Sequence, residues 1–276
     1  MKITILVENT PKDASIPAEH GFSFHIEGCG KRILLDAGQK SLFAENAARL
    51  GVSLAAVDFA VLSHGHGDHS GGLPAFRAAN PTAPVYMARE ATRRCYLRRY
   101  GVLYFNVGMG RSFAKDARIV PLDADTKLAP GVTAVVGIPR ASAYLTTSDN
   151  LYMRKGLWFA RDDFAHELAL VLREGARTFV FSSCSHTGLQ NIMRRVADAG
   201  LLGEETKVFA GMHLFNSPGK RNESAELLDR LAVELLAYPA ATYYAGHCTG
   251  QAAFDRLKAT MGERLQPLRC GDAFEF

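Results

Sequence analysis

The sequence predicts an α/β fold, and two observations support this prediction. Short apolar runs typical of strands recur along the 276 residues, and several are followed by segments with the apolar period of amphipathic helices. Four of the apolar runs also end in a short polar turn that contains a histidine. Because loops at strand ends carry the ligand sites of α/β sheets, we expect these histidines to converge on one site.

Residues 1–88 contain a regular series of expected strands and helices. Glycines 28 and 30 separate two β-like runs, which predicts a hairpin. Ser41 and Gly51 are the expected start and stop signals of a helix. The expected strands are 2–7, 22–26, 32–35, 59–62 and 85–88, and the expected helices are 41–50 and 73–79.

Residues 89–165 are less regular. We expect a helix over 90–100, which would carry Arg93, Arg94 and Arg98. The next sixty or so residues mix short β-like runs with Gly, Pro and Asp. No segment is long or polar enough to be a linker, so we expect a single domain over 1–276, with 89–165 as an insert or cap over the site.

The last part of the chain again alternates between expected strands and helices. A turn at residues 174–175 predicts a hairpin, and Asn222 is the expected cap of a long helix. The expected strands are 168–172, 178–182, 207–210 and 242–245, and the expected helices are 189–199, 223–237 and 251–261.

The composition is that of an ordinary globular protein, with 47% hydrophobic and 22% charged residues. The net charge of +4 does not indicate a nucleic-acid partner, but it is compatible with an anionic or phosphorylated small-molecule substrate. The five cysteines are odd in number and widely spaced, which is not a disulfide framework. We find no signal-peptide pattern and no apolar run of membrane-spanning length, and therefore expect a cytoplasmic protein without membrane partners.

The strongest chemical signal is residues 63–72, Ser-His-Gly-His-Gly-Asp-His-Ser-Gly-Gly, directly after an apolar strand. His64 and His66 are two residues apart, so they point to the same side of an extended backbone. Asp68 and His69 follow as the chain turns and can face the same point from a second direction. Imidazole and carboxylate groups suit a borderline cation such as zinc, and the sequence therefore predicts a metal site here.

The later strand ends supply His186, His213 and His247. The hairpin of residues 166–186 adds a geometric point, because the two ends of a hairpin lie at the same end of a sheet. If His186 binds metal, the residues at both ends of this hairpin are also candidates. These possible additional ligands are His166, Glu167 and Cys184.

Together these motifs resemble the metallo-β-lactamase superfamily. They are Leu-Asp-Ala-Gly at 35–38, the HxHxDH run at 64–69, and the histidines at later strand ends. The resemblance implies a four-layer αββα sandwich with a dinuclear metal site at one edge. It also implies the site residues: His64 and His66 for the first metal, Asp68, His69 and His247 for the second, and Asp36 to orient the site.

The resemblance leaves the third ligand of the first metal and the bridging ligand open. In one alignment His186 is the third histidine and His213 occupies the bridging region. In the other, His166 or Glu167 is the third ligand, and Cys184 or His186 replaces the bridge. We favour His186 as a ligand in either alignment.

Four further segments, residues 19–23, 184–188, 211–214 and 246–250, resemble the dihydropteroate-synthase-like branch of this superfamily. Membership of a branch does not determine the reaction, because one fold hosts many chemistries. Our leading hypothesis is hydrolysis of an ester, lactone, thioester or phosphodiester. It would use two divalent ions, zinc first and manganese or iron as alternatives. Asp68 would orient the nucleophile, and His213 would donate a proton or hold a phosphate.

Two other classes of function are compatible with the motifs. The resemblance implies a transferase that joins a pterin-methyl diphosphate to an aminobenzene ribosyl phosphate, with metal stabilising the leaving group. Arg93, Arg94 and Arg98 could then bind phosphate, although a solvated helix face is the alternative explanation for them. The third class is a metal or ligand sensor without catalytic activity.

Overall fold

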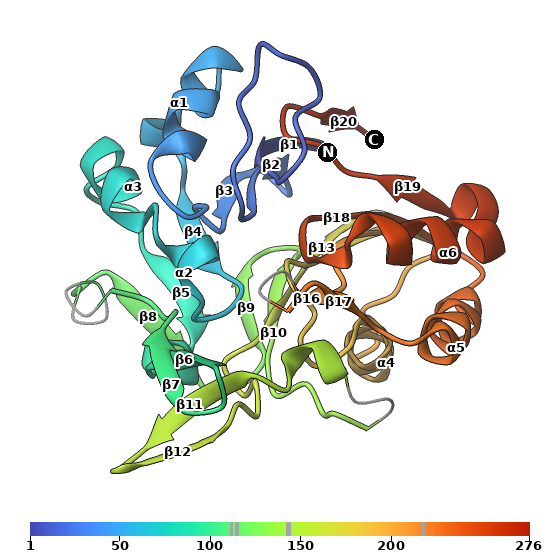
Figure 1. The fold of residues 1–276 in the computed structure, drawn as a ribbon. Coiled ribbons are helices and arrows are strands. Elements are labelled where there is room, and N and C mark those ends of the chain that lie inside the picture. The colour runs from blue at the N-terminus through green and yellow to red at the C-terminus, as the bar shows by residue number, and fades with distance from the viewer. Residues whose placement is uncertain (111–112, 114–115, 142–144, 217–218) are drawn as a thin grey trace. The chain divides into compact units, whose positions relative to one another are not determined.

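The computed structural model describes residues 1–110, 113, 116–141, 145–216 and 219–276. The chain divides into two compact units, which alternate along the sequence (Figure 1). Unit 1 comprises Met1–Ala124, Asn150–Leu168 and Arg269–Phe276, and unit 2 comprises Asp125–Asp149 and Ala169–Leu268.

Unit 1 is built on a seven-stranded mixed sheet with the order β20-β1-β2-β3-β4-β5-β8. The first four strands in this order pair antiparallel, and β3, β4, β5 and β8 pair parallel. The parallel pairing of β3 and β4 brings the ends of these two strands to the same edge of the sheet. The strands are β1 (Lys2–Val7), β2 (Ser23–Gly28), β3 (Lys31–Leu35), β4 (Phe59–Leu62), β5 (Val85–Ala88), β8 (Ile119–Leu122) and β20 (Ala273–Glu275).

Helices cover one face of this sheet, because alternate strand residues and the apolar faces of the helices form one core. Leu34 and Leu62 from the strands pack with Phe43 of α1 and Phe76 of α3, and all four are buried. The expected helix that begins after Ser41 and the hairpin closed at residues 28–30 are both confirmed. The helices are α1 (Leu42–Arg49), α2 (Gly67–Ser70) and α3 (Leu73–Ala79), with 3₁₀ turns at η1 (Leu54–Ala56) and η2 (Arg89–Thr92).

A second, smaller sheet in unit 1 has the order β12-β11-β6-β7. Its strands are β6 (Cys95–Arg99), β7 (Leu103–Asn106), β11 (Leu151–Lys155) and β12 (Trp158–Arg161). The helix expected over 90–100 is therefore wrong. Pairing of β6 with both β7 and β11 outweighs the helical preference of its arginines, since it satisfies the backbone on both sides and buries Cys95 and Tyr96.

Unit 2 is built on another seven-stranded mixed sheet, with the order β19-β18-β15-β14-β13-β10-β9. Strands β14, β15, β18 and β19 pair parallel, and the remaining neighbours pair antiparallel. The expected hairpin with its turn at 174–175 is confirmed as β13–β14. The strands are β9 (Thr126–Ala129), β10 (Val132–Val135), β13 (Ala169–Glu174), β14 (Arg177–Ser182), β15 (Glu205–Gly211), β18 (Ala241–Gly246) and β19 (Leu265–Pro267).

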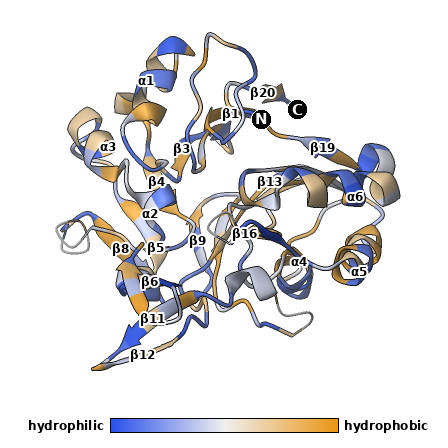
Figure 2. Cartoon of the chain, in the orientation of Figure 1, coloured by the Kyte–Doolittle hydropathy of each residue, from blue (hydrophilic) through white to orange (hydrophobic). Residues whose placement is uncertain are grey.

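Three amphipathic helices pack on the sheet of unit 2, and Figure 2 shows hydrophobic and hydrophilic residues side by side on them. Ser224, not the expected Asn222, caps the longest helix, because its side chain accepts a hydrogen bond from the Leu227 N–H. The helices are α4 (Leu189–Asp198), α5 (Ala225–Leu236) and α6 (Gln251–Met261). Short elements complete the unit: η4 (Thr146–Ser148), β16 (Phe215–Asn216), β17 (Arg221–Asn222), η5 (His247–Thr249) and η6 (Gly262–Arg264).

The expected insert, residues 89–165, is distributed over both units. Its strand β8 extends the large sheet of unit 1, and β9 and β10 extend that of unit 2. Residues 111–112, 114–115 and 142–144 of this region lie outside the described residues. In the part of the chain that the structure describes, no helix has the length and apolar character needed to cross a membrane.

Candidate metal centre

The histidine motif of unit 1 lies in the turn that leads from β4 into α2. His66 has extended backbone and is the N-cap residue of α2, so the chain turns into the helix immediately before Asp68 and His69. The ring centroid of His64 lies 4.7 Å from that of His66 and 4.3 Å from that of His69. All three imidazoles are buried. The structure thus brings the predicted histidines together from two directions, as the spacing indicated.

The two glycines that end the motif allow it to pack against the segment after β3. A Cβ on Gly71 would lie 2.0 Å from the carbonyl oxygen of Gln39, and a Cβ on Gly72 would lie 2.0 Å from that of Ala37. Any side chain at these positions would therefore push the motif away from this segment. The close approach matters because the same segment carries Asp36.

Asp36 is buried, and its carboxylate organises the motif. Oδ1 accepts a hydrogen bond from the Ser63 N–H at 2.8 Å, and Oδ2 accepts from the Ser63 hydroxyl at 2.7 Å and from His69 Nδ1 at 2.8 Å. Since the Ser63 hydroxyl donates to Asp36, its oxygen accepts from His64 Nδ1 at 2.8 Å. Both imidazoles then carry their proton on Nδ1 and their lone pair on Nε2. This is the arrangement by which a carboxylate orients metal-binding histidines.

The carboxylate of Asp68 lies at the more open side of the motif. Its Oδ2 is 3.5 Å from His69 Nε2 and 3.3 Å from His20 Nε2, and its side chain is 21% exposed. His20 is a residue that the motif reasoning did not place at the site. Its position in the Glu-His-Gly segment just before β2 was the available signal.

Burial keeps the imidazoles of His64 and His66 in the neutral form that a metal requires. Burial first, and then the neighbouring His166, lower the pKa of His66 to about 3. Burial, followed by repulsion from His69 and His66, holds the pKa of His64 well below its usual value. Neutral imidazoles and an acidic oxygen therefore stand ready near pH 7 as ligands for a borderline divalent cation, and this donor set fits the metal that the motif predicts.

A second buried group in unit 1 contains His166, one of the possible additional ligands. Donor atoms of His66, Cys95, Asp162 and His166 all lie within 4.8 Å of one another. Cys95 and Asp162 were not anticipated, because nothing in their local sequence marks them. Glu167 is also buried, and its backbone N–H donates to the Phe164 carbonyl at 2.9 Å.

His166 and Asp162 influence each other's charge. Burial alone would raise the pKa of Asp162, but His166, with His66 and the Phe164 N–H, outweighs burial and lowers that pKa to about 2. Burial alone would lower the pKa of His166, but the Asp162 carboxylate, together with Cys95, outweighs burial and raises that pKa well above its usual value. A second proton on His166 would have to occupy Nδ1, to which the Gly65 N–H already donates at 3.1 Å. The charge of Asp162 thus favours the imidazolium, whereas the hydrogen bond from Gly65 requires an unprotonated Nδ1. The observed hydrogen bond is compatible with the neutral ring, which has its proton on Nε2.

Unit 2 contains a separate group of histidines and cysteines. His186, His213 and His247 follow β14, β15 and β18, and these neighbouring parallel strands end at the same edge of the sheet. The ring centroids of His186 and His213 are 4.1 Å apart, and the sulfur atoms of Cys184 and Cys248 are 3.5 Å apart. The expected convergence of strand-end histidines is thus observed for these three. Cys248 is the one member that sequence reasoning missed, although it directly follows His247.

The three predicted phosphate-binding arginines lie on or next to β6 rather than on a helix. Arg93 and Arg94 line a surface hollow of about 780 Å³ together with Arg154 and Lys155. Arg93 also forms an ion pair with Glu90, and the guanidinium of Arg98 lies 4.7 Å from the centre of the Tyr152 ring. The hollow is strongly basic, which is compatible with an anionic ligand.

Comparison with known proteins places this geometry in context. Residues 16–146 match a family model described as the metallo-beta-lactamase superfamily. The chain is 23% identical over 277 residues to the Methanocaldococcus jannaschii 7,8-dihydropterin-6-methyl-4-(beta-D-ribofuranosyl)-aminobenzene-5'-phosphate synthase, covering 94% of this chain and 90% of that protein. It is 28% identical over 258 residues to an uncharacterized protein of the same organism, covering 92% and 93% of the two chains.

Among solved structures, the crystal structure of Tm1679 is similar over 100% of this chain and 99% of its own, with a TM-score of 0.84 and 22% identity. Tm1679 is described as a metal-dependent hydrolase of the beta-lactamase superfamily. Sequence and structural similarity agree, and the resemblance inferred from the motifs is confirmed for the fold. The chain has the metallo-β-lactamase fold, and its residues 16–146 match the sequence model of that superfamily.

Proposed function

We propose that the protein is a metal-dependent hydrolase of a small ester, lactone, thioester or phosphodiester. One observation carries this proposal: the buried imidazoles of His64 and His69, whose Nδ1 atoms are engaged in the hydrogen bonding around Asp36, which leaves Nε2 of each ring for a ligand. Burying several imidazoles with a carboxylate is costly unless they share a ligand, and a divalent cation is the ligand that suits them.

The proposed ligands combine the motif with residues carried over from the superfamily resemblance. In unit 1 they are His64, His66, Asp68 and His69. The superfamily resemblance adds His186 and His247 as proposed ligands, with Cys184 and Glu167 as candidates for any remaining position. The proposed cofactors are two divalent ions, with zinc favoured over manganese or iron because most of the donors are imidazole nitrogens.

The roles of the residues follow from their exposure and contacts. A divalent cation at this site supplies Lewis-acid polarisation of the substrate and lowers the pKa of water. Asp68 is the acidic group of the motif that solvent reaches, so it can orient a water molecule and accept its proton. His213, whose ring lies 4.1 Å from that of His186 between centroids, is the proposed proton donor to the leaving group.

Metal analysis and hydrolysis assays test the proposal together. We expect the purified protein to contain transition metal, to lose hydrolysis of an ester, lactone, thioester or phosphodiester panel on chelation, and to regain it with zinc or manganese. His69→Ala should lower both metal content and activity. His25→Gln is the matched control, because His25 is a buried histidine of unit 1 that lies on β2, outside the motif. Full hydrolytic activity in metal-free protein would refute the proposal.

A transfer reaction is the second candidate, and the named synthase among the relatives favours it. In that reaction the basic hollow beside Arg93 and Arg94 would hold phosphate groups. The two candidate functions predict the binding of different small molecules. If the protein is a transferase, a pterin or its methyl diphosphate should raise the melting temperature of metal-loaded protein, and Arg94→Ala should weaken the effect of the diphosphate. No shift at high ligand concentration would count against transfer and leave hydrolysis as the proposal.

A further inference from the structure

His166 lies against the histidine motif although it is far from it in sequence. It follows β12, and its ring is nearly parallel to that of His64, with the centroids 6.0 Å apart. Its centroid is 5.3 Å from that of His66. The ring is completely buried, so each of its nitrogens needs a partner.

The segment around His166 binds the backbone on both sides of His64. The Leu168 N–H donates to the carbonyl oxygen of Ser63 at 2.8 Å, and the Gly65 N–H donates to His166 Nδ1 at 3.1 Å. These two hydrogen bonds hold the peptide groups that flank His64. A displacement of His166 would therefore displace the backbone between the first two histidines of the motif.

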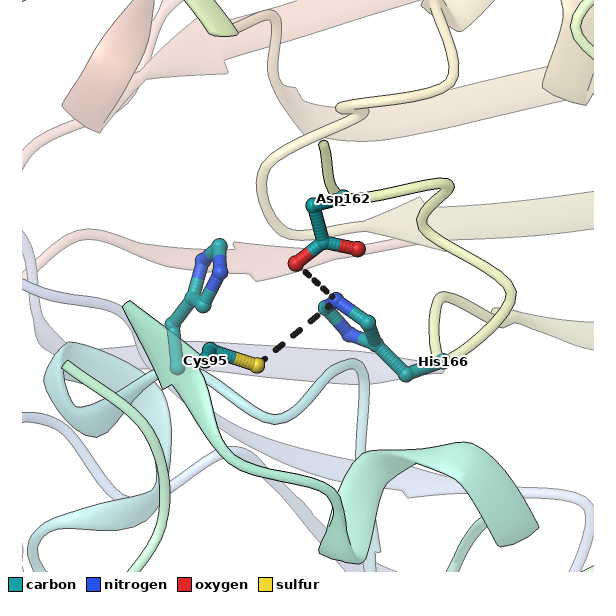
Figure 3. Close-up of side chains that lie close together, drawn as sticks. Cys95, Asp162 and His166 are labelled. Atoms are coloured by element: carbon teal, nitrogen blue, oxygen red, sulfur yellow. Dashed lines mark hydrogen bonds and ion pairs between the residues drawn. The ribbon is translucent and has the colours of Figure 1, made fainter. Parts of the chain in front are cut away.

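The hydrogen bond from Gly65 also determines which nitrogen of His166 carries the proton. Because Nδ1 accepts, the proton of the neutral ring is on Nε2. Figure 3 shows this nitrogen directed toward Asp162 and Cys95, at 3.2 Å from Asp162 Oδ2 and 3.9 Å from Cys95 Sγ. The other oxygen of Asp162 accepts from the Phe164 N–H at 2.8 Å, which holds the carboxylate in place.

This arrangement is the reverse of the one around His69. His69 donates from Nδ1 to Asp36 and keeps its lone pair on Nε2, as a metal ligand does. For His166 to bind metal through Nε2, its proton would have to move to Nδ1, where it would face the Gly65 N–H. Two donors would then oppose each other in a buried position, which is unfavourable.

We propose that His166 is a positioning residue and not a metal ligand: it holds the Gly65 peptide between His64 and His66, and Asp162 holds His166 in the tautomer that this requires. His166 then supports the motif by accepting a hydrogen bond from the backbone of Gly65, whereas Asp36 supports it by accepting hydrogen bonds from Ser63 and His69. The expected effect on metal affinity rests on the proposed function. The expected position of the His166 proton does not rest on it.

Two substitutions distinguish positioning from metal binding. His166→Gln keeps one acceptor for the Gly65 N–H and one donor for Asp162, whereas His166→Leu keeps neither. We expect both variants to bind the same number of zinc equivalents as the unaltered protein. We expect zinc affinity to remain within a few-fold in His166→Gln and to fall about 10- to 100-fold in His166→Leu, the range found for residues that orient ligands. His64→Gln, which alters a proposed ligand, is the matched comparison and should lose zinc.

Nitrogen NMR of the unaltered protein gives a readout that does not depend on how the variants fold. We expect the His166 ring to carry its proton on Nε2 both without metal and with zinc. A proton on Nδ1 in the zinc-loaded protein, or loss of a zinc equivalent from His166→Gln, would overturn the inference. If the unaltered protein binds no zinc at all, the proposed function fails, but the Nε2 proton is still expected and its absence would still refute the role of His166.

Discussion

The two units bring histidines together in different ways. Unit 1 takes them from one turn after β4, where His64, His66 and His69 lie within six residues. Unit 2 takes them from the ends of three strands, at His186 and further along the chain. The first group depends on side-chain hydrogen bonds and close backbone packing, and the second depends on the parallel register of a sheet. A local motif and a dispersed one therefore respond to different substitutions.

The largest expected effect is at Asp36, on which the arrangement of the histidine motif in unit 1 depends. Asp36→Asn replaces one acceptor oxygen by a donor, so the amide cannot accept from Ser63 and His69 together. We expect zinc affinity to fall about 10- to 100-fold, measured by competition with a chelator of known affinity. Asp123→Asn is the control, since Asp123 is an exposed carboxylate paired with Arg89. Unchanged affinity in Asp36→Asn would show that the motif holds its shape without this carboxylate.

The corresponding contact in unit 2 joins two strand ends. The Met212 N–H, after β15, donates to Thr249 Oγ1, after β18, at 3.1 Å, and both residues are buried. Thr249→Val keeps the shape but leaves the amide without its acceptor, so we expect a loss of about 1–3 kcal/mol in the free energy of unfolding, measured in urea. Thr242→Val, at a partly buried position on β18, should change stability by less than about 0.5 kcal/mol. Equal stability of the two variants would mean that register alone aligns these strand ends.

The smallest expected effect concerns the N-caps of two helices, one in each unit. The Ser224 side chain accepts from the Leu227 N–H at 3.2 Å at the start of α5, whereas the Ser41 side chain makes no capping hydrogen bond at the start of α1. Ser224→Ala should lower the free energy of unfolding by about 1 kcal/mol, and Ser41→Ala should lower it by only a few tenths. Thermal unfolding of the two variants side by side measures this. A larger loss in Ser41→Ala would contradict the capping geometry.

Much of the fold could be predicted because its information is local. Turn residues at 28–30 and 174–175 predict hairpins, and the apolar period predicts the helices after Gly188 and Gly250, since each signal lies within the element it specifies. The helix expected over 90–100 was wrong because distant partners decide the structure of this segment. Residues 95–99 form a strand because two other strands pair with them, and no property of the pentapeptide reveals those partners.

The candidate site likewise has one part that local sequence signals predict and another part that depends on distant partners. By itself the sequence determined the histidine turn, because two-residue spacing, a following turn and the Gly-Gly end are all local features of residues 63–72. Only the tertiary structure decided what surrounds it. His20, Cys95 and Asp162 lie near the motif because strands far apart in sequence pair there, and the hydrogen bond from Gly65 fixes the proton of His166. The order of strands sets which side chains meet, and hydrogen-bond direction then sets which of them can bind metal.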